Sequence, residues 1–296
     1  MSDNISKSHA AHEAHMHEHY KINEEYRFFH IKNKDCVSYQ TNIRSLNMLL
    51  PFWSTRSSWL TVGDYNGLEA NFLVGKGLNV TASDISDVYL QEAQKEGLID
   101  EFSKQNVENL SYLNESFDFV MCREAFHHFP RAYLGLYEMM RVAKTAAIIV
   151  EPIDIVSKMP WLLFIKNITD RINPLLINKI WRNRFSFETS GNYVFKIGER
   201  EIEKMAMGAG LPMIAFRSMN VIASIKEYAL DVPMNKPLYR KLMRKIKLLD
   251  FLNYFGIIPA NSLVCVVFKR LPDEEMLNKM KKLKYKIIPL AKNPYL

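Results

Sequence analysis

Three side chains that can transfer protons stand together at Glu124, His127 and His128, directly after Arg123 and the apolar run 117–122. A neutral imidazole can accept a proton near pH 7, because its unperturbed pKa is about 6.5. If the segment forms one helical turn, Glu124 and His128 share a face, and the carboxylate can orient the ring. We therefore expect His128 to act as a general base, with Glu124 as its partner and His127 as a second candidate.

A possible nucleotide-binding unit precedes these residues. Residues 59–62 predict a short apolar strand, 68–74 a helix, and 79–83 a second strand that ends on Asp84, which Ile85 follows. In such units backbone N–H groups at glycines approach the ligand, and an acid at the end of the second strand accepts two ribose hydroxyls. The turn before the helix supplies the other expected contacts to a nucleoside-containing cofactor: Gly63, Asp64, Tyr65, Asn66 and Gly67.

The glycine pattern argues against a nicotinamide cofactor. That fingerprint is G-x-G-x-x-G, whereas Tyr65 occupies the position of the middle glycine here. The spacing from Gly63 to Asp84 fits a dinucleotide or another nucleoside cofactor. A strand–helix–strand unit with a tight turn and no ligand is the plain alternative, and the motifs further along the chain count against it.

At these motifs the sequence resembles the class I S-adenosylmethionine-dependent methyltransferases. The resemblance covers residues 58–155 well and 195–270 loosely, and it rests on VGDYNG, TASDIS, QNVENLSY and SFDFVMCREAFHHFPR. The last motif, with LYEMMRVAK and IIVEPID behind it, is similar to methyltransferases of bacterial surface-polysaccharide (O-antigen or capsule) gene clusters.

The resemblance implies S-adenosyl-L-methionine as the cofactor and S-adenosyl-L-homocysteine as its product. It places Asn106 at the adenine amine and Val107 near the ring, and we add Arg123 to the expected cofactor contacts. Two positions depart from the family pattern. Thr61 stands where the first strand usually ends on an acid, with Asp64 three residues later, and Asn106 replaces the usual aspartate at the adenine edge.

The resemblance also implies an α/β fold of the Rossmann-like class I methyltransferase type, with a seven-stranded, mostly parallel sheet and helices on both faces. The seventh strand, 262–270, is expected to pair antiparallel at the edge of the sheet. The expected parts are an N-terminal helical cover (1–58), a cofactor-binding core (59–155), a helical lid insertion (156–197), the rest of the core (198–272) with a basic amphipathic helix insertion (233–256), and a basic C-terminal tail (273–296).

The charge is unevenly distributed along the 296 residues, whose net charge is +7. Residues 1–150 hold 14 basic and 19 acidic side chains, whereas residues 151–296 hold 25 and 13. This asymmetry suggests that the C-terminal half faces an anionic partner. The amphipathic helix 236–254 and the tail 275–296 are candidates for contact with an anionic membrane surface. An ordinary surface helix and a strap across the domain are the respective alternatives.

The first 20 residues hold five histidines, at His9, His12, His15, His17 and His19. Such tracts can bind metals, but no cysteine or carboxylate cluster completes a coordination set, so a solvated or frayed helix is the favoured interpretation. The following helical, aromatic segment is expected to cover the cofactor. Four side chains are candidates either for lining the site or for packing in the core: Tyr20, Tyr26, His30 and Tyr39.

The sequence predicts a cytoplasmic protein, with a peripheral position at the inner face of the membrane as an open alternative. Three widely spaced cysteines give no disulfide framework, and the chain shows no signal peptide and no run of 18 apolar residues.

The expected reaction is methylation of a sugar hydroxyl, in a surface glycan or in its nucleotide- or lipid-linked precursor. Alternatives are a nucleic-acid or other small-molecule methyltransferase and a cofactor-binding scaffold without turnover. Nucleic acid is not favoured, because no N/D-P-P-[YF] motif follows the fourth strand. A divalent ion that holds a diol is possible but also not favoured; its ligands would come from Glu124, His127, His128, Glu151 and Asp154.

Overall fold

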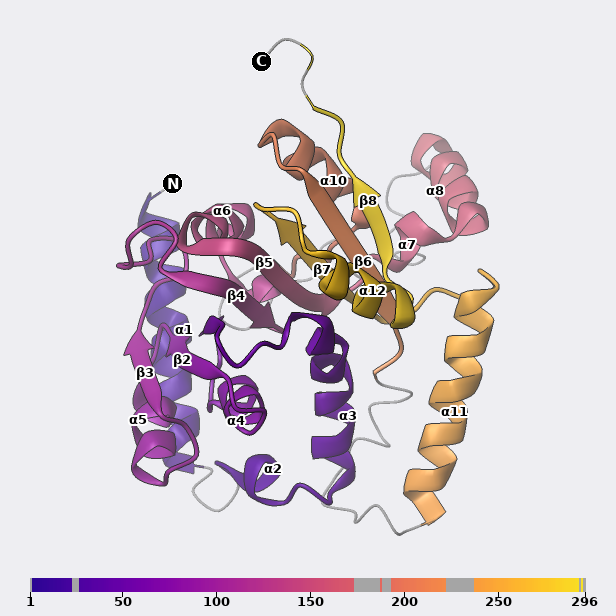
Figure 1. Cartoon of the computed structure of the whole chain (residues 1–296). Coiled ribbons are helices and arrows are strands. Elements are labelled where there is room, and N and C mark those ends of the chain that lie inside the picture. The colour runs from indigo at the N-terminus through magenta and orange to yellow at the C-terminus, as the bar shows by residue number, and fades with distance from the viewer. Residues whose placement is uncertain are drawn as a thin grey trace.

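A computed structural model of the chain describes residues 2–22, 27–172, 187, 193–221, 237–292 and 294. Its centre is one eight-stranded sheet with the order β3-β2-β1-β4-β5-β7-β6-β8 (Figure 1). The strands are β1 (Ser58–Val62), β2 (Asn79–Asp84), β3 (Glu101–Lys104), β4 (Phe117–Arg123), β5 (Ala143–Pro152), β6 (Met213–Met219), β7 (Ser262–Phe268) and β8 (Lys286–Pro289).

Helices cover both faces of this sheet (Figure 1). The α-helices are α1 (Ser2–Ile22), α2 (Phe29–Lys32), α3 (Val37–Leu46), α4 (Leu68–Val74), α5 (Val88–Lys95), α6 (Ala132–Val142), α7 (Ile155–Lys158), α8 (Pro160–Ile172), α10 (Glu199–Gly208), α11 (Pro237–Tyr254) and α12 (Glu274–Lys282). Short 3₁₀ turns are η2 (Asn47–Phe52) and η3 (Phe126–His128).

The sheet separates two apolar cores, because neighbouring residues of a strand point to opposite faces. Trp59 and Phe119 pack on the face covered by α3, α4, α5 and α12. Leu60 and Val120 pack on the face covered by α6 and α10. Strands β1 to β5 pair in parallel, so their carboxyl ends meet at one rim of the sheet. The expected Rossmann-like arrangement is confirmed.

The far side of the sheet differs in detail from the expectation. β7 is antiparallel, as predicted, but it lies between β5 and β6 instead of at the edge. All seven of its residues are buried, which is the burial expected of a strand covered on both faces. The edge is formed by β8, an eighth strand that pairs antiparallel with β6.

The predicted basic tail is therefore part of the domain up to at least β8. Met280 of α12 and Tyr285 are buried in the core, and the Tyr285 hydroxyl donates to the Met48 carbonyl at 2.8 Å. The interpretation as a strap across the domain fits this placement, whereas a free membrane-binding tail does not.

The predicted amphipathic helix forms α11, which lies on the opposite side of the domain from α1 (Figure 1). Leu242 and Ile246 are buried against Val37, and Asp250 pairs with Arg44. Helices α7 and α8 occupy the first part of the predicted lid, and most of its remainder lies outside the described residues. Among the helices that the structure describes, none is both long and apolar enough to span a bilayer.

Candidate active site

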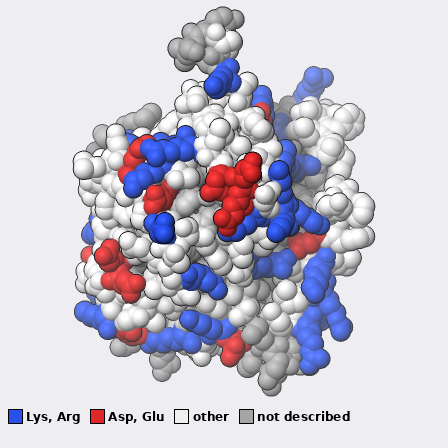
Figure 2. All heavy atoms as spheres, viewed as in Figure 1, with Lys and Arg blue, Asp and Glu red and all other residues white. Residues whose placement is uncertain are grey.

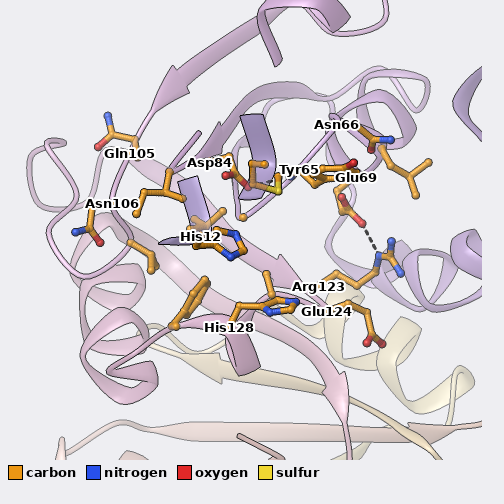
Figure 3. A pocket seen from close by; sticks show the side chains of 18 of the residues that line it. His12, Tyr65, Asn66, Glu69, Asp84, Gln105, Asn106, Arg123, Glu124 and His128 are labelled. Atoms are coloured by element: carbon orange, nitrogen blue, oxygen red, sulfur yellow. Dashed lines mark hydrogen bonds and ion pairs between the residues drawn. The ribbon is translucent and has the colours of Figure 1, made fainter. Parts of the chain in front are cut away.

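A cavity of about 450 Å³ opens at the rim where β1, β2 and β4 end (Figure 3). The turn after β1, the acid at the end of β2 and the segment after β4 all reach it, as the sequence predicted. The predicted site residues that line it are Gly63, Tyr65, Asn66, Asp84, Ile85, Asn106, Val107, Arg123, Glu124 and His128.

Asp64 and Gly67 support the turn without lining the cavity. The Asp64 carboxylate is 1% exposed and accepts hydrogen bonds from the Thr61 hydroxyl at 2.6 Å and the Ala70 N–H at 2.9 Å. Burial, and then the neighbouring Glu69, raise its pKa well above the usual value. The side chain thus closes the start of α4, so the prediction that it contacts the cofactor is wrong for the carboxylate.

The turn after β1 is held close to the segment after β4. Gly63 has φ +67, and a Cβ at this position would lie 2.6 Å from the Ala125 Cβ, so only glycine fits. Tyr65, in the place of the middle glycine, also has a positive φ of 25. Its ring packs on Tyr89, with the centroids 4.4 Å apart. An aromatic contact therefore accompanies the unusual backbone at this position.

Asp84 is a buried carboxylate at the edge of the cavity. One of its oxygens accepts the Tyr65 N–H at 3.1 Å and the other accepts the Ser86 N–H at 3.0 Å. Burial raises its pKa to about 6, even though these N–H groups favour the charged form. An acceptor of this kind suits a pair of ribose hydroxyls.

An ion pair that the sequence did not reveal crosses the other end of the cavity. Arg123 Nε lies 2.5 Å from Glu69 Oε1 (Figure 3). Burial alone would raise the pKa of Glu69, but the Arg123 charge keeps it below its usual value. Glu69 lies in α4, which follows β1, and Arg123 lies at the end of β4. The two side chains meet because β1 and β4 are neighbouring parallel strands, and this pairing is not visible in the local sequence.

The carboxylate that holds a histidine is Glu151, at the end of β5. His127 Nδ1 lies 2.6 Å from Glu151 Oε2, while Glu151 Oε1 accepts the N–H groups of Ala125 and Phe126, each at 2.7 Å. Glu151 is fully buried. The His127 ring packs against that of His128, with centroids 4.1 Å apart.

The expected pairing of Glu124 with His128 is wrong. It required a helical turn that starts at Glu124, but this residue has φ +51 and its carboxyl points away from the His128 ring (Figure 3). Glu124 is reached by solvent, yet the surrounding protein removes enough water to raise its pKa to about 7, with a smaller contribution from the Glu151 charge.

A possible metal site was one of the open alternatives. Among the described residues, ligand atoms of Glu124, His127 and Glu151 lie within 4.8 Å of one another. His128 and Asp154, the other two candidates, do not join this group. One Glu151 oxygen accepts two backbone N–H groups, and the other is hydrogen-bonded to His127. Both oxygens of this carboxylate therefore have hydrogen-bond partners within the protein.

The histidine-rich segment forms the roof of the cavity. His9, His12, His15 and Met16 line it from α1, and the ring of His12 faces His128 at a centroid distance of 5.7 Å (Figure 3). The interpretation as a solvated or frayed helix is therefore wrong for this face. Residues 9, 12 and 16 are spaced by three and four positions, so the sequence already indicated that they share one face of a helix.

The aromatic candidates of the predicted cover have different places. His30 lines the cavity, whereas Tyr39 is buried in the core. Tyr20 packs on Tyr89 and donates to Glu92 at 3.4 Å. Tyr26 lies outside the described residues.

Residues 60–150 match the family model described as "Methyltransferase domain". Together with the Rossmann-like sheet order, this match shows a methyltransferase domain over these residues, and the protein is an S-adenosylmethionine-dependent methyltransferase. The cofactor is S-adenosylmethionine, and the buried Asp84 carboxylate fits its ribose. A search of curated proteins gave no match.

Solved structures match this chain at low sequence identity. A chain from the Haloferax volcanii complex of the Trm112 methyltransferase activator with a putative methyltransferase is 13% identical, with a TM-score of 0.51, and the match covers 85% of this chain and 97% of that one. A putative methyltransferase from Bacillus halodurans is 19% identical (TM-score 0.47, 77% and 98% covered). Magnesium protoporphyrin IX methyltransferase from Synechocystis, with bound S-adenosylhomocysteine, is 14% identical (TM-score 0.47, 84% and 96% covered).

Acidification is expected to weaken cofactor binding through Asp84. Below its pKa of about 6 the carboxyl is protonated, and the ribose hydroxyls lose a charged acceptor. We expect the affinity for S-adenosylhomocysteine, measured by calorimetry, to fall about tenfold between pH 7 and pH 5. Asp84→Asn should bind weakly at both pH values, and an unchanged pH dependence in this variant would assign the effect to another group.

Gly63→Ala is expected to weaken cofactor binding by about tenfold or more, because the new methyl group would push the turn away from Ala125. Gly77→Ala is the matched control: Gly77 has φ +78, but a Cβ there meets no atom within 4 Å. The control should therefore show only the backbone strain, roughly 1 kcal/mol of stability, and normal binding. Equal cofactor affinity in the two variants would contradict the close approach.

Proposed function

We propose that the enzyme methylates a sugar hydroxyl of a surface glycan, or of its nucleotide- or lipid-linked precursor, and that His128 takes the proton. The observation that carries this proposal is the place of His128 in the cofactor cavity, packed on a histidine that Glu151 holds. The similarity of the 116–131 motif to methyltransferases of surface-polysaccharide clusters supports the choice of a sugar.

The cavity offers complementary groups for each part of S-adenosylmethionine. Asp84 would accept the ribose hydroxyls, and Val107 would lie against the adenine. Asn106 Oδ1 already accepts the Glu108 N–H at 3.0 Å, so its amide NH₂ is the group best placed to donate to an adenine ring nitrogen. The Arg123–Glu69 pair matches the opposite charges of the methionine carboxylate and ammonium.

When bound, S-adenosylmethionine would supply an activated methyl group for in-line displacement by the acceptor oxygen. The protein must hold the acceptor oxygen in line, and this positioning can supply most of the acceleration. The acceptor hydroxyl also loses a proton, which a neutral His128 can take. The neighbouring His127 is fixed by Glu151 and can serve as the base if the acceptor enters from its side.

A divalent ion that holds a sugar diol is the second candidate mechanism. It rests on the convergence of Glu124, His127 and Glu151. A nucleic-acid acceptor and a scaffold role have less support, because neither needs two histidines beside a buried carboxylate at the strand ends.

His128→Gln is expected to lower kcat about 100-fold or more, because a general base typically contributes that factor. Cofactor affinity, measured by calorimetry, should change little. Methyl transfer would be measured with a panel of sugar nucleotides and lipid-linked sugars. His127→Gln in the same assay identifies which histidine is the base: retention of activity in His128→Gln within a factor of about ten, with loss in His127→Gln, would transfer the role.

An anionic membrane surface is a further proposed partner, and α11 supports it. Leu248 and Phe251 are more than half exposed, and helical spacing places them opposite the buried Leu242 and Ile246; Phe255, directly after the helix, is also more than half exposed. The exposed basic side chains of the helix are Arg240, Lys241, Arg244, Lys245 and Lys247. Figure 2 shows the basic residues gathered along this helix. A basic, partly apolar helix face suits the interface of an anionic bilayer.

Replacement of Arg240, Arg244 and Lys247 by Gln is expected to weaken binding to phosphatidylglycerol vesicles roughly 100-fold, at about 1 kcal/mol per charge. Co-sedimentation at low salt measures the binding. A control triple variant with Gln at Lys95, Lys281 and Lys282, which are also exposed, removes the same net charge elsewhere. An equal loss in both variants would indicate a general charge effect and no specific role for α11.

A further inference from the structure

A second cavity, of about 710 Å³, lies near the ends of β5 and β6, on the side of the sheet away from Asp84. Because β7 is antiparallel to both strands, β6 runs parallel to β5, and the two strands end at the same rim as the cofactor site. The methyltransferase chemistry described above uses none of its residues. Its charged lining consists of Lys158, Arg217, Lys284, Lys286, Glu199 and Asp250.

The cations of this lining outnumber its carboxylates by four to two. Glu199 is shared by two lysines, Lys158 and Lys286, the latter at 2.8 Å. Asp250 is engaged by Arg44 and by the Asn220 N–H at 3.0 Å. The existing ion pairs therefore leave the positive charges of this cavity only partly compensated.

Arg217 is the most unusual of these cations. Its guanidinium is half-buried and donates from one nitrogen to the Ser218 carbonyl at 3.2 Å. Within the part of the chain that the structure describes, its buried Nε has no hydrogen-bond partner. Burial lowers its pKa, which is the expected consequence of desolvating an incompletely paired cation. A buried donor without a partner is costly, and a bound anion would satisfy it.

Aromatic side chains form the other part of the lining. Phe251, Tyr254 and Phe255 line the cavity and are 57%, 70% and 61% exposed. The Lys284 ammonium lies 4.9 Å from the centre of the Tyr254 ring, so the cationic and apolar parts of the lining are in direct contact. A ligand that fits both parts carries an anionic head and an adjoining hydrocarbon.

We propose that this cavity binds the phosphate or diphosphate group of a lipid-linked molecule, with Arg217 and Lys284 on the phosphate oxygens and the three aromatic side chains of the lining on the hydrocarbon. Guanidinium and ammonium groups donate strongly to phosphate oxygens. That this molecule is the acceptor's carrier rests on the proposed function, whereas the binding itself does not.

The test is calorimetry on the full chain loaded with S-adenosylhomocysteine, with farnesyl diphosphate, uridine diphosphate and inorganic pyrophosphate as probes. Farnesyl diphosphate should bind most tightly, because it alone offers both a diphosphate and a hydrocarbon. Arg217→Gln and Lys284→Gln should each weaken it about tenfold, since a hydrogen bond to a charged group is lost. Lys282→Gln, which removes an exposed lysine outside the cavity, should leave the affinity unchanged.

Three results would overturn the assignment. Absence of farnesyl diphosphate binding, or equal binding by wild type and the cavity variants Arg217→Gln and Lys284→Gln, would exclude a phosphate site in this cavity. Tighter binding of uridine diphosphate than of farnesyl diphosphate would exclude the lipid-linked ligand. Failure of methyl transfer to every sugar acceptor, with anion binding intact, would contradict only the proposed function.

Discussion

The buried carboxylate of Glu151 accepts hydrogen bonds from three groups of the segment that follows β4: two backbone N–H groups and the His127 ring. These bonds tie the end of β5 to the end of β4 and hold a segment in which Glu124 has a left-handed backbone. Such a conformation is costly for a residue with a side chain and persists only where the surroundings fix it. The position of His128 in the cavity depends on this anchor.

The turn after β1 depends on a comparable buried acid. Asp64 bonds to Thr61 and to N–H groups at the start of α4, so Asp64 compensates for the threonine that stands in place of an acid at the end of β1. The acid stands in the turn instead of at the strand end, where its oxygens accept the N–H groups of Glu69 and Ala70 at the start of the helix. These hydrogen bonds fix the turn that contains Gly63, which lines the cavity.

The sequence was sufficient to predict the strands and helices around the cofactor, because each has a strong local signal. The bounds predicted for α4 and β2 agree with the structure, as does the convergence of Gly63, Asp84 and His128. Contacts between side chains distant in sequence were not predictable. Glu151 lies 24 residues from His127, and nothing local distinguishes it from Glu124 as the partner.

Two further errors have the same physical origin. α1 has few apolar residues, so its polar composition suggested solvent exposure, although one face packs over a cavity that accepts polar side chains. β8 has only four residues and follows a basic helix, so its sequence carries almost no strand signal. Its pairing is determined by the free edge of β6, which is a property of the folded sheet.

The two outer strands of the sheet, β3 and β8, are both only four residues long. Charged Glu101 and Lys104 begin and end one of them, and the other begins at Lys286 and ends at Pro289, which has no N–H to offer a neighbouring chain. Short, charged or proline-ended borders discourage strand-by-strand stacking of one molecule onto the next. The central strands are rich in apolar residues, so edges of this kind protect the protein against fibre growth. Strand β8 supplies one of the two protected edges.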